Sequence, residues 1–145
     1  MEHSIQIRFI EKEELLANAN IFLLLNPKLS LETIKHRIET LYSEPGNYNA
    51  VGVFLNENLI GVTGIWILNK IYVGKHLEMD NVVIKEDYRS LGIGKYLEEF
   101  TENFAREINC EAIELNAYVN NAKGHKFWFS RGYQILGFHF QKKLK

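Results

Sequence analysis

The chain has 145 residues, a formal net charge of −1 and one cysteine, with 46% apolar and 24% charged residues. This length fits a single domain, 1–145, with its own hydrophobic core, and the near-neutral charge offers no basic field for nucleic acid or an anionic membrane. A lone cysteine excludes an internal disulfide, no apolar run could cross a membrane and the N-terminus lacks a signal-peptide core, so we expect a cytoplasmic protein.

The first part of the chain alternates between strand and helix patterns. The expected elements are a strand over 4–10, helices over 11–26 and 30–44, and strands over 48–56 and 59–68. Ser30 is the expected N-cap of the second helix, and Pro45-Gly46 should end that helix. The short connection at 56–58, Asn-Glu-Asn, predicts a β-hairpin.

The second part of the chain predicts a strand–helix–strand crossover followed by a helix and a strand. The expected elements are a strand over 76–84, a helix over 92–109, a strand over 110–119, a helix over 121–131 and a strand over 133–143. The crossover makes the strands 76–84 and 110–119 parallel neighbours, and the remaining pairs should be antiparallel. We therefore expect an α+β fold with three layers, containing a mixed, mostly antiparallel sheet of six to seven strands and about four helices.

The stretch YRSLGIGKYLEEF, residues 88–100, places two glycines at the start of a long amphipathic helix. The first N–H groups of a helix lack intrahelical partners and the helix dipole adds partial positive charge there, so this position suits an anion. Gly92 and Gly94 let a bulky anion approach the backbone, and Arg89 and Lys95 add charge. The residue types therefore indicate a diphosphate site.

Other glycine motifs fit this stretch less well. A Walker A loop needs Gly where Arg89 stands and Ser or Thr where Tyr96 stands, so that motif is excluded. The dinucleotide fingerprint G-x-G-x-x-G would need Gly or Ala at Leu97, which makes it a weak match. The remaining alternative is a pair of turn or packing glycines that binds nothing.

Two segments resemble the GCN5-related N-acetyltransferases (GNAT). VVIKEDYRSLGIGKYL resembles the acetyl-CoA motif R/Q-x-x-G-x-G/A, which Arg89, Gly92 and Gly94 fill. NNAKGHKFWFSRGYQI resembles the family segment N-x-x-A-x-x-F-Y-x-x-x-G-F, with Gly124 and Trp128 in place of the usual Ala and Tyr. The order of predicted elements agrees with the GNAT fold, and the resemblance covers essentially the whole chain.

The resemblance implies acetyl-CoA as co-substrate and no metal. The diphosphate would lie on the helix N-terminus, the pantetheine would pair with strand 76–84 like an added strand, and the parallel strands would splay to admit it. The implied cofactor-binding residues are Val82, Val83, Ile84, Arg89, Ser90, Leu91, Gly92, Ile93, Gly94, Lys95, Asn121, Phe127 and Trp128. His3, His36 and His139 show no spacing typical of metal ligands.

The resemblance implies an acyl-CoA-dependent N-acetyltransferase that passes an acetyl group directly to a primary amine of a small molecule or peptide in a ternary complex. Trp128 stands where the family's Tyr commonly protonates the departing thiolate, and an indole N–H is no general acid at neutral pH. This departure keeps a second reading open, a non-catalytic acyl-CoA-binding sensor or regulatory module. A structural protein without any cofactor is a third reading, which the intact glycine motif disfavours.

Four residues are candidates for proton transfer. An amine acceptor must lose a proton before it attacks a thioester, and Asp80 and Glu78, two apart on one strand face, are the first and second candidates for the base. His125 and Tyr118 are candidates to protonate the thiolate or bind the acceptor. Each also has an ordinary reading, as a solvated acid, a helix-surface histidine or a strand-end tyrosine.

The identity of the acceptor is the least determined feature of the sequence. In the family the acceptor site is built by the first two helices, here 11–44, and by the loops around 69–75 and 119–126. Glu32, Glu39 and Glu44 give a weak preference for a cationic amine. The resemblance also allows a homodimer, which no residue of this sequence indicates.

Overall fold

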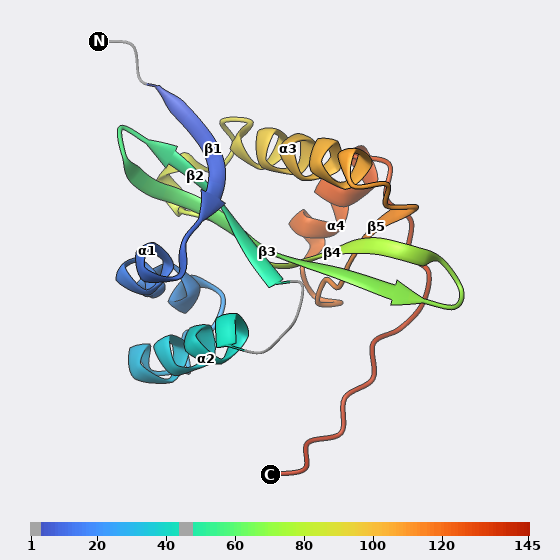
Figure 1. Ribbon diagram of the computed structural model, residues 1–145, viewed down its shortest axis with the longest axis horizontal. Helices are drawn as coiled ribbons and strands as arrows, with labels where there is room; N and C mark the ends of the chain where they lie inside the picture. The colour runs from blue at the N-terminus through green and yellow to red at the C-terminus, as the bar shows by residue number, and fades with distance from the viewer. Residues whose placement is uncertain (1–3, 44–47) are drawn as a thin grey trace. The chain divides into compact units, whose positions relative to one another are not determined.

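The computed structural model describes residues 4–43 and 48–145 (Figure 1). Its internal contacts divide the chain into two compact units, Met1–Glu114 and Leu115–Lys145. The single domain expected over 1–145 stays a prediction. No helix in the described part of the chain is long and apolar enough to span a membrane.

A five-stranded sheet forms the centre of the first unit, with its strands in chain order (Figure 1). The strands are β1 (Ile5–Ile10), β2 (Tyr48–Leu55), β3 (Asn58–Lys70), β4 (Gly74–Ile84) and β5 (Ala112–Leu115). The pairs β1–β2, β2–β3 and β3–β4 are antiparallel. β5 lies beside β4, and the Glu111 N–H donates to the Lys75 carbonyl at 2.8 Å. This contact joins the beginnings of the two strands, as the predicted parallel pair requires.

The hairpin between β2 and β3 was predicted correctly. Leu55 pairs with Asn58, so the turn contains Asn56 and Glu57. Both turn residues have positive φ angles, 48° and 67°. Two consecutive residues of this kind make the turn whose twist matches that of the flanking strands.

The helices agree with the predicted ones in place but differ in extent. They are α1 (Lys12–Ala17), η1 (Ala19–Leu24), α2 (Leu31–Ser43), η2 (Glu86–Tyr88), α3 (Ile93–Glu107) and α4 (Ala122–Ser130), where η marks a 3-10 helix. The helix predicted over 11–26 is divided at Asn18, whose side-chain amide donates to the Glu14 carbonyl at 2.9 Å. Such local side-chain bonds compete with the helical pattern, which explains the break.

The expected N-cap of α2 is confirmed. The Thr33 N–H donates to Ser30 Oγ at 3.0 Å, which satisfies one of the unpaired donors at the helix start. The expected end of this helix at Pro45-Gly46 lies outside the described residues.

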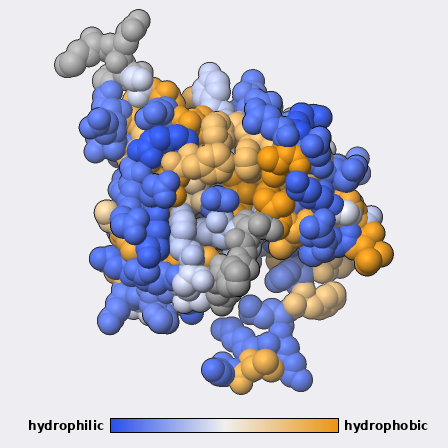
Figure 2. Space-filling model, viewed as in Figure 1, coloured by the Kyte–Doolittle hydropathy of each residue, from blue (hydrophilic) through white to orange (hydrophobic). Residues whose placement is uncertain are grey.

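Helices cover both faces of the sheet in the first unit (Figure 1). On one face, Leu15, Phe22, Ile34 and Ile38 pack against Ala50, Phe54, Val62 and Val83 in a buried core. On the other face, Phe9 of β1 meets Phe100 and Phe104 of α3 edge-on, with ring centroids 5.8 and 5.0 Å apart. The predicted three-layer arrangement is therefore confirmed for this unit. Figure 2 shows the outward surface of α1 and α2 as mainly hydrophilic, as amphipathic helices require.

The predicted number of strands was too high. The strand expected over 110–119 is limited to Ala112–Leu115, and the residues expected to form a strand over 133–143 adopt no regular secondary structure. A strand needs a neighbour to pair its N–H and C=O groups, and no such ladder is recorded for this described segment. Its alternating apolar residues stay exposed, with Phe138 82% and Phe140 90% exposed. Apolar and polar residues do alternate in this segment, but alternation alone does not provide a neighbouring strand for it to pair with.

Candidate cofactor and catalytic site

The connection from β4 to α3 has an unusual backbone that only some residues tolerate. Gly92 is the N-cap of α3 with φ 79° and ψ 4°, and Ser90 has φ 65°. A Cβ at Gly92 would meet only Tyr96 Cε2, at 3.9 Å, so space alone does not require glycine there. The requirement comes from the left-handed conformation, which glycine adopts without strain.

The first turn of α3 presents backbone N–H groups as the motif predicts. The Tyr96 N–H donates to the Gly92 carbonyl at 3.2 Å, so the N–H groups of Ile93, Gly94 and Lys95 precede the first bond of the helix. Ile93 is buried and anchors this turn. Together with the helix dipole, these donors form a site that suits an anion.

Arg89 stabilises the same connection from β4 to α3. Its Nε donates to the carbonyl of Ile84, the last residue of β4, at 2.9 Å. The residue is exposed, and its two terminal nitrogens lie outside this contact. Arg89 therefore fixes the loop through one nitrogen and adds positive charge beside the helix N-terminus.

A β-bulge interrupts β4 in the segment expected to hold the pantetheine. Val62 pairs with Val83 and Gly64 with Asp80, so two residues of β4, Asn81 and Val82, lie opposite Thr63 alone. Asn81 has φ 50°. The buried Thr63 hydroxyl shares its one proton between the Gly64 carbonyl at 3.0 Å and the Asp80 carbonyl at 3.2 Å. A bulge of this kind leaves backbone groups out of the ladder and is typical of strands beside active sites.

The outer edge of β4 is only partly covered by β5. β5 has four residues against eleven in β4, and its contact begins at Lys75. Strands of this kind rise by similar distances per residue, so β5 reaches no further than the first half of β4. The edge at Val82, Val83 and Ile84 is therefore not paired by β5, and the expected splaying of the two strands stays a prediction.

Asp80 and Glu78 share one face of β4, as predicted, because Leu77 before them and Met79 between them are buried in the core. Asp80 Oδ2 accepts a hydrogen bond from Trp66 Nε1 at 3.4 Å. Trp66 also packs against Tyr48, with ring centroids 5.0 Å apart. Burial, with the nearby Tyr42 and the Asp80 charge, raises the pKa of the Tyr48 hydroxyl. Asp80 thus lies beside the packed aromatic rings of Trp66 and Tyr48.

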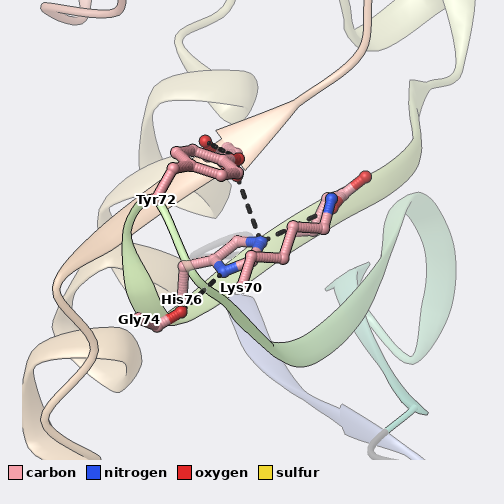
Figure 3. Close-up of polar contacts among 6 residues, drawn as sticks. Lys70, Tyr72, Gly74 and His76 are labelled. Carbon is pink, nitrogen blue, oxygen red and sulfur yellow. Dashed lines mark hydrogen bonds and ion pairs between the residues drawn. The ribbon is translucent and has the colours of Figure 1, made fainter.

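Glu78 belongs to a different group of side chains, which we call the polar cluster: Lys70, Tyr72, His76, Glu78 and Glu114 (Figure 3). His76 is fully buried, and its Nε2 lies 3.1 Å from Glu114 Oε2 and 3.7 Å from Glu78 Oε2. The Tyr72 hydroxyl donates to the Glu114 carboxylate, and this bond is the main cause that raises the pKa of Tyr72 to about 12.

Tyr72, His76 and Glu114 were not predicted as site residues from the sequence. His76 stands two residues before Glu78, so the alternation of a strand could have placed both on one face. The predicted pairing of the strands 76–84 and 110–119 placed Glu114 on the neighbouring strand, but the sequence did not give the register that brings it to His76.

A cavity of about 490 Å³ opens between the first helices and the bulge in the first unit. It is lined by Phe22, Asn26, Ile34, His36, Arg37, Ile38, Thr40, Leu41, Tyr48 and Asn81. No acid is among these described lining residues. Glu39 instead lies 3.3 Å from Lys12, and Glu44 is outside the described residues. The cavity gives no support to the predicted preference for a cationic amine.

The second unit contains the remaining candidates. Asn121 caps α4 by accepting the Gly124 N–H at 3.0 Å, and a Cβ at Gly124 would lie 2.4 Å from Asn121 Nδ2. The glycine that departs from the family pattern therefore fits this cap. His125 Nε2 lies 2.8 Å from the carbonyl of Tyr118, whose side chain is exposed. The predicted roles of these residues stay predictions.

The aromatic residues of this unit form a small stack. Trp128 lies edge-on to Phe127 and to Tyr133, with ring centroids 4.8 and 5.1 Å apart. Trp128 therefore has a packing role in α4. The roles of Phe127 and Trp128 toward a cofactor also stay predictions.

Known proteins of similar sequence and structure point to one family. The profile of the Acetyltransferase (GNAT) family matches residues 17–133. An uncharacterized N-acetyltransferase of Bacillus subtilis (strain 168), YhdJ, is 25% identical over 92% of this chain and 94% of its own.

Solved structures share the fold at lower identity. The aminoglycoside N-acetyltransferase AAC(6')-Iy, in complex with CoA, has a TM-score of 0.84 at 14% identity and covers 100% of this chain and 98% of its own. A GNAT family acetyltransferase of Staphylococcus aureus has a TM-score of 0.77 at 23% identity, over 97% of this chain and 99% of its own. Because the family profile spans most of the sequence, the chain belongs to the acetyltransferase (GNAT) family.

Proposed function

We propose that this protein is an acetyl-CoA-dependent N-acetyltransferase that transfers the acetyl group directly to a primary amine in a ternary complex. One observation carries the proposal: the Gly92-capped N-terminus of α3 follows directly from a bulged strand whose outer edge at Val82–Ile84 is not paired by β5. This combination provides an anion site and a free strand edge in one continuous segment, as a diphosphate linked to an extended amide chain requires.

The backbone provides most of the binding. The N–H groups from Leu91 to Lys95 hold the diphosphate, and Arg89 adds charge and fixes the loop through its bond to Ile84. The open edge at Val82, Val83 and Ile84 pairs with the amides of the pantetheine arm. For Asn121, Phe127 and Trp128, which belong to the second unit, cofactor contacts stay a prediction from the family resemblance.

The bulge positions the reacting carbonyl. A backbone N–H near Val83 donates to the thioester oxygen and stabilises the negative charge that develops there. The bond from Thr63 Oγ to the Asp80 carbonyl holds this part of β4 in shape. Such fixed donors cost no reorganisation during the reaction.

The carboxylates of β4 remove the proton from the acceptor. Asp80 is the first candidate for the base because it lies directly before the bulge, and Glu78 is the second. The neutral amine attacks the carbonyl carbon and a C–N bond forms. The nitrogen then gives its extra proton to solvent, the C–S bond breaks and the sulfur leaves as thiolate. A thiol with a pKa near ~8.5 departs well as an anion, and it then takes a proton from Tyr118, His125 or water.

The cavity under α2 is our candidate for the acceptor site. It extends to Asn81 in the bulge and to Tyr48 beside Trp66. A small molecule or the end of a peptide fits a cavity of this size. His36 and Arg37 among its lining residues make amines that also carry a carboxylate a useful part of any substrate panel.

The experiment is free-thiol release from acetyl-CoA across a panel of amines, amino acids, polyamines and peptides. A signal that requires one particular amine establishes the enzyme and its acceptor class. Absence of acetyl-CoA binding by calorimetry would contradict the proposal outright.

Trp128 favours one alternative, a non-catalytic acyl-CoA-binding sensor or regulatory module. This alternative predicts acetyl-CoA binding without turnover, and a large gain of activity in Trp128→Tyr. Little change in a protein that already turns over would favour the working enzyme with another acid.

A further inference from the structure

The polar cluster contains a histidine nitrogen that protein contacts leave without a hydrogen bond. His76 is fully buried, and its Nδ1 lies 3.2 Å from the Gly74 carbonyl, which can only accept a proton. Nδ1 is therefore the donor. Nε2 is buried and makes no hydrogen bond to any described group, although Glu114 Oε2 lies 3.1 Å away. A buried polar atom in this position calls for a partner.

Two carboxylates lie close to Nε2, yet neither forms a hydrogen bond with it. Glu114 Oε2 is 3.1 Å and Glu78 Oε2 is 3.7 Å from this nitrogen. If Nε2 carries no proton, its lone pair faces two carboxylates, which is unfavourable. A cation between the three groups would satisfy all of them at once.

We propose that His76, Glu78 and Glu114 form a binding site for a divalent transition-metal ion of the zinc type. One ligand atom from each residue lies within 4.8 Å of the others. With Zn–N and Zn–O bonds of about 2.0–2.2 Å, two ligands of a tetrahedral ion lie roughly 3.3 Å apart. The distances from Nε2 to the two carboxylates, 3.1 and 3.7 Å, bracket this value.

The surroundings of the three ligands resemble those of a metal site. The Nδ1 contact with the Gly74 carbonyl fixes the tautomer that leaves Nε2 free to ligate, and Tyr72 holds Glu114 by a hydrogen bond. The side chains of Glu78 and Glu114 are 22% and 17% exposed, which gives an ion a route in. Imidazole and carboxylate ligands suit Zn²⁺, whereas Mg²⁺ prefers oxygen ligands alone.

Two features of the cluster compete with a metal. Lys70 Nζ lies 3.9 Å from Glu78 Oε2, but this lysine is 49% exposed and can turn toward solvent. A protonated His76 would also compensate the carboxylates in part, although its Nε2 proton would lack a well-aligned acceptor. The site has three protein ligands, which leaves a fourth position open. An ion here would occupy Glu78 and leave Asp80 as the base of the proposed reaction.

The test is metal uptake by the purified full chain after treatment with a chelator. Zn²⁺ is titrated by calorimetry, and Co²⁺ is followed by its visible absorption, which reports the ligand geometry. We expect one ion per chain, a rise in the thermal midpoint on adding Zn²⁺, and no comparable effect of Mg²⁺. Neither readout depends on acetyl-CoA or on turnover.

Variants identify the ligands. Glu78→Gln and Glu114→Gln keep the shape of each side chain and should each weaken Zn²⁺ binding at least ~10-fold, and Tyr72→Phe should weaken it less. His76→Ala should abolish binding, and because His76 is buried the two glutamine variants carry the test if that protein unfolds. His139→Ala, at an exposed histidine of the second unit, is the matched control. No uptake by the wild type, or wild-type affinity for Zn²⁺ in both glutamine variants, would overturn the site.

Discussion

The two halves of β4 present different chemistry along one continuous strand. The half before the bulge presents side chains: His76, Glu78 and Asp80 alternate with residues of the core. The half after the bulge and the connection to α3 present the backbone, through the open edge at 82–84 and the N-terminus of α3.

This difference separates two tasks. Backbone groups bind a cofactor whose shape is constant, and they depend on conformation rather than on side-chain identity. Side chains before the bulge can vary with the acceptor and carry proton transfer. The bulge at Asn81 and Val82, where the two halves meet, is where both parts of the reaction must be aligned.

The largest effect is expected from the side-chain half. Asp80→Asn removes the proposed base while keeping the side-chain size, so kcat should fall by about 10²–10⁴-fold. Acetyl-CoA affinity, measured by calorimetry, should stay unchanged because the residue lies before the binding edge. Asp87→Asn, at the exposed aspartate of η2, is the control for kcat. An unaltered rate in Asp80→Asn would move the role to Glu78 or to solvent.

Arg89→Ala should produce the largest change in the backbone half. It removes a charged partner of the diphosphate and the Nε bond to the Ile84 carbonyl. A hydrogen bond to a charged group contributes about 1.5–3 kcal/mol, so acetyl-CoA affinity should fall by roughly 10–150-fold.

Two further arginine variants sharpen this result. Arg89→Lys keeps the charge without the bond to Ile84 and should give an intermediate affinity. Arg106→Ala, on the exposed side of α3 where Arg106 pairs with Glu102, should leave affinity unchanged. Equal affinity in Arg89→Ala and the wild type would remove this residue from the cofactor site.

A pair of glycines tests the role of backbone conformation. The Cβ added by Gly92→Ala meets no close atom. The substitution therefore costs only the conformational free energy of a left-handed φ in alanine, about 1–2 kcal/mol. If the loop relaxes in the free protein, binding must restore it and affinity should fall by roughly 5–30-fold. Gly74→Ala carries the same strain, with φ 76° at the other end of β4, and should lower the thermal midpoint without changing affinity. Equal affinities in both variants would mean that Gly92 serves the fold alone.

The two halves of β4 differ in how many of their functional residues the sequence predicts, and the reason is physical. The glycine motif was readable because Arg89, Gly92 and the helix it opens are close in sequence, and their roles depend on local backbone geometry. The shared face of Glu78 and Asp80 followed from strand alternation. The association of Glu114 with His76 was not predicted, because the sequence indicates that β5 lies beside β4 but not the register in which the two strands pair. The strand expected over 133–143 failed similarly, since alternation does not specify a partner.

The smallest predicted effect concerns the junction itself. Thr63→Val removes the buried hydroxyl that donates to the Asp80 carbonyl, and Thr101→Val removes a buried hydroxyl that donates to the Leu97 carbonyl within α3. Each should lower the free energy of unfolding by about 1 kcal/mol, measured by urea denaturation. Only Thr63→Val should also lower kcat, by about 2–10-fold, because only this bond holds the bulge that aligns base and thioester. Equal kcat in the two variants would show that the bulge keeps its shape without Thr63, and that the two halves of β4 are aligned by the core residues beneath them.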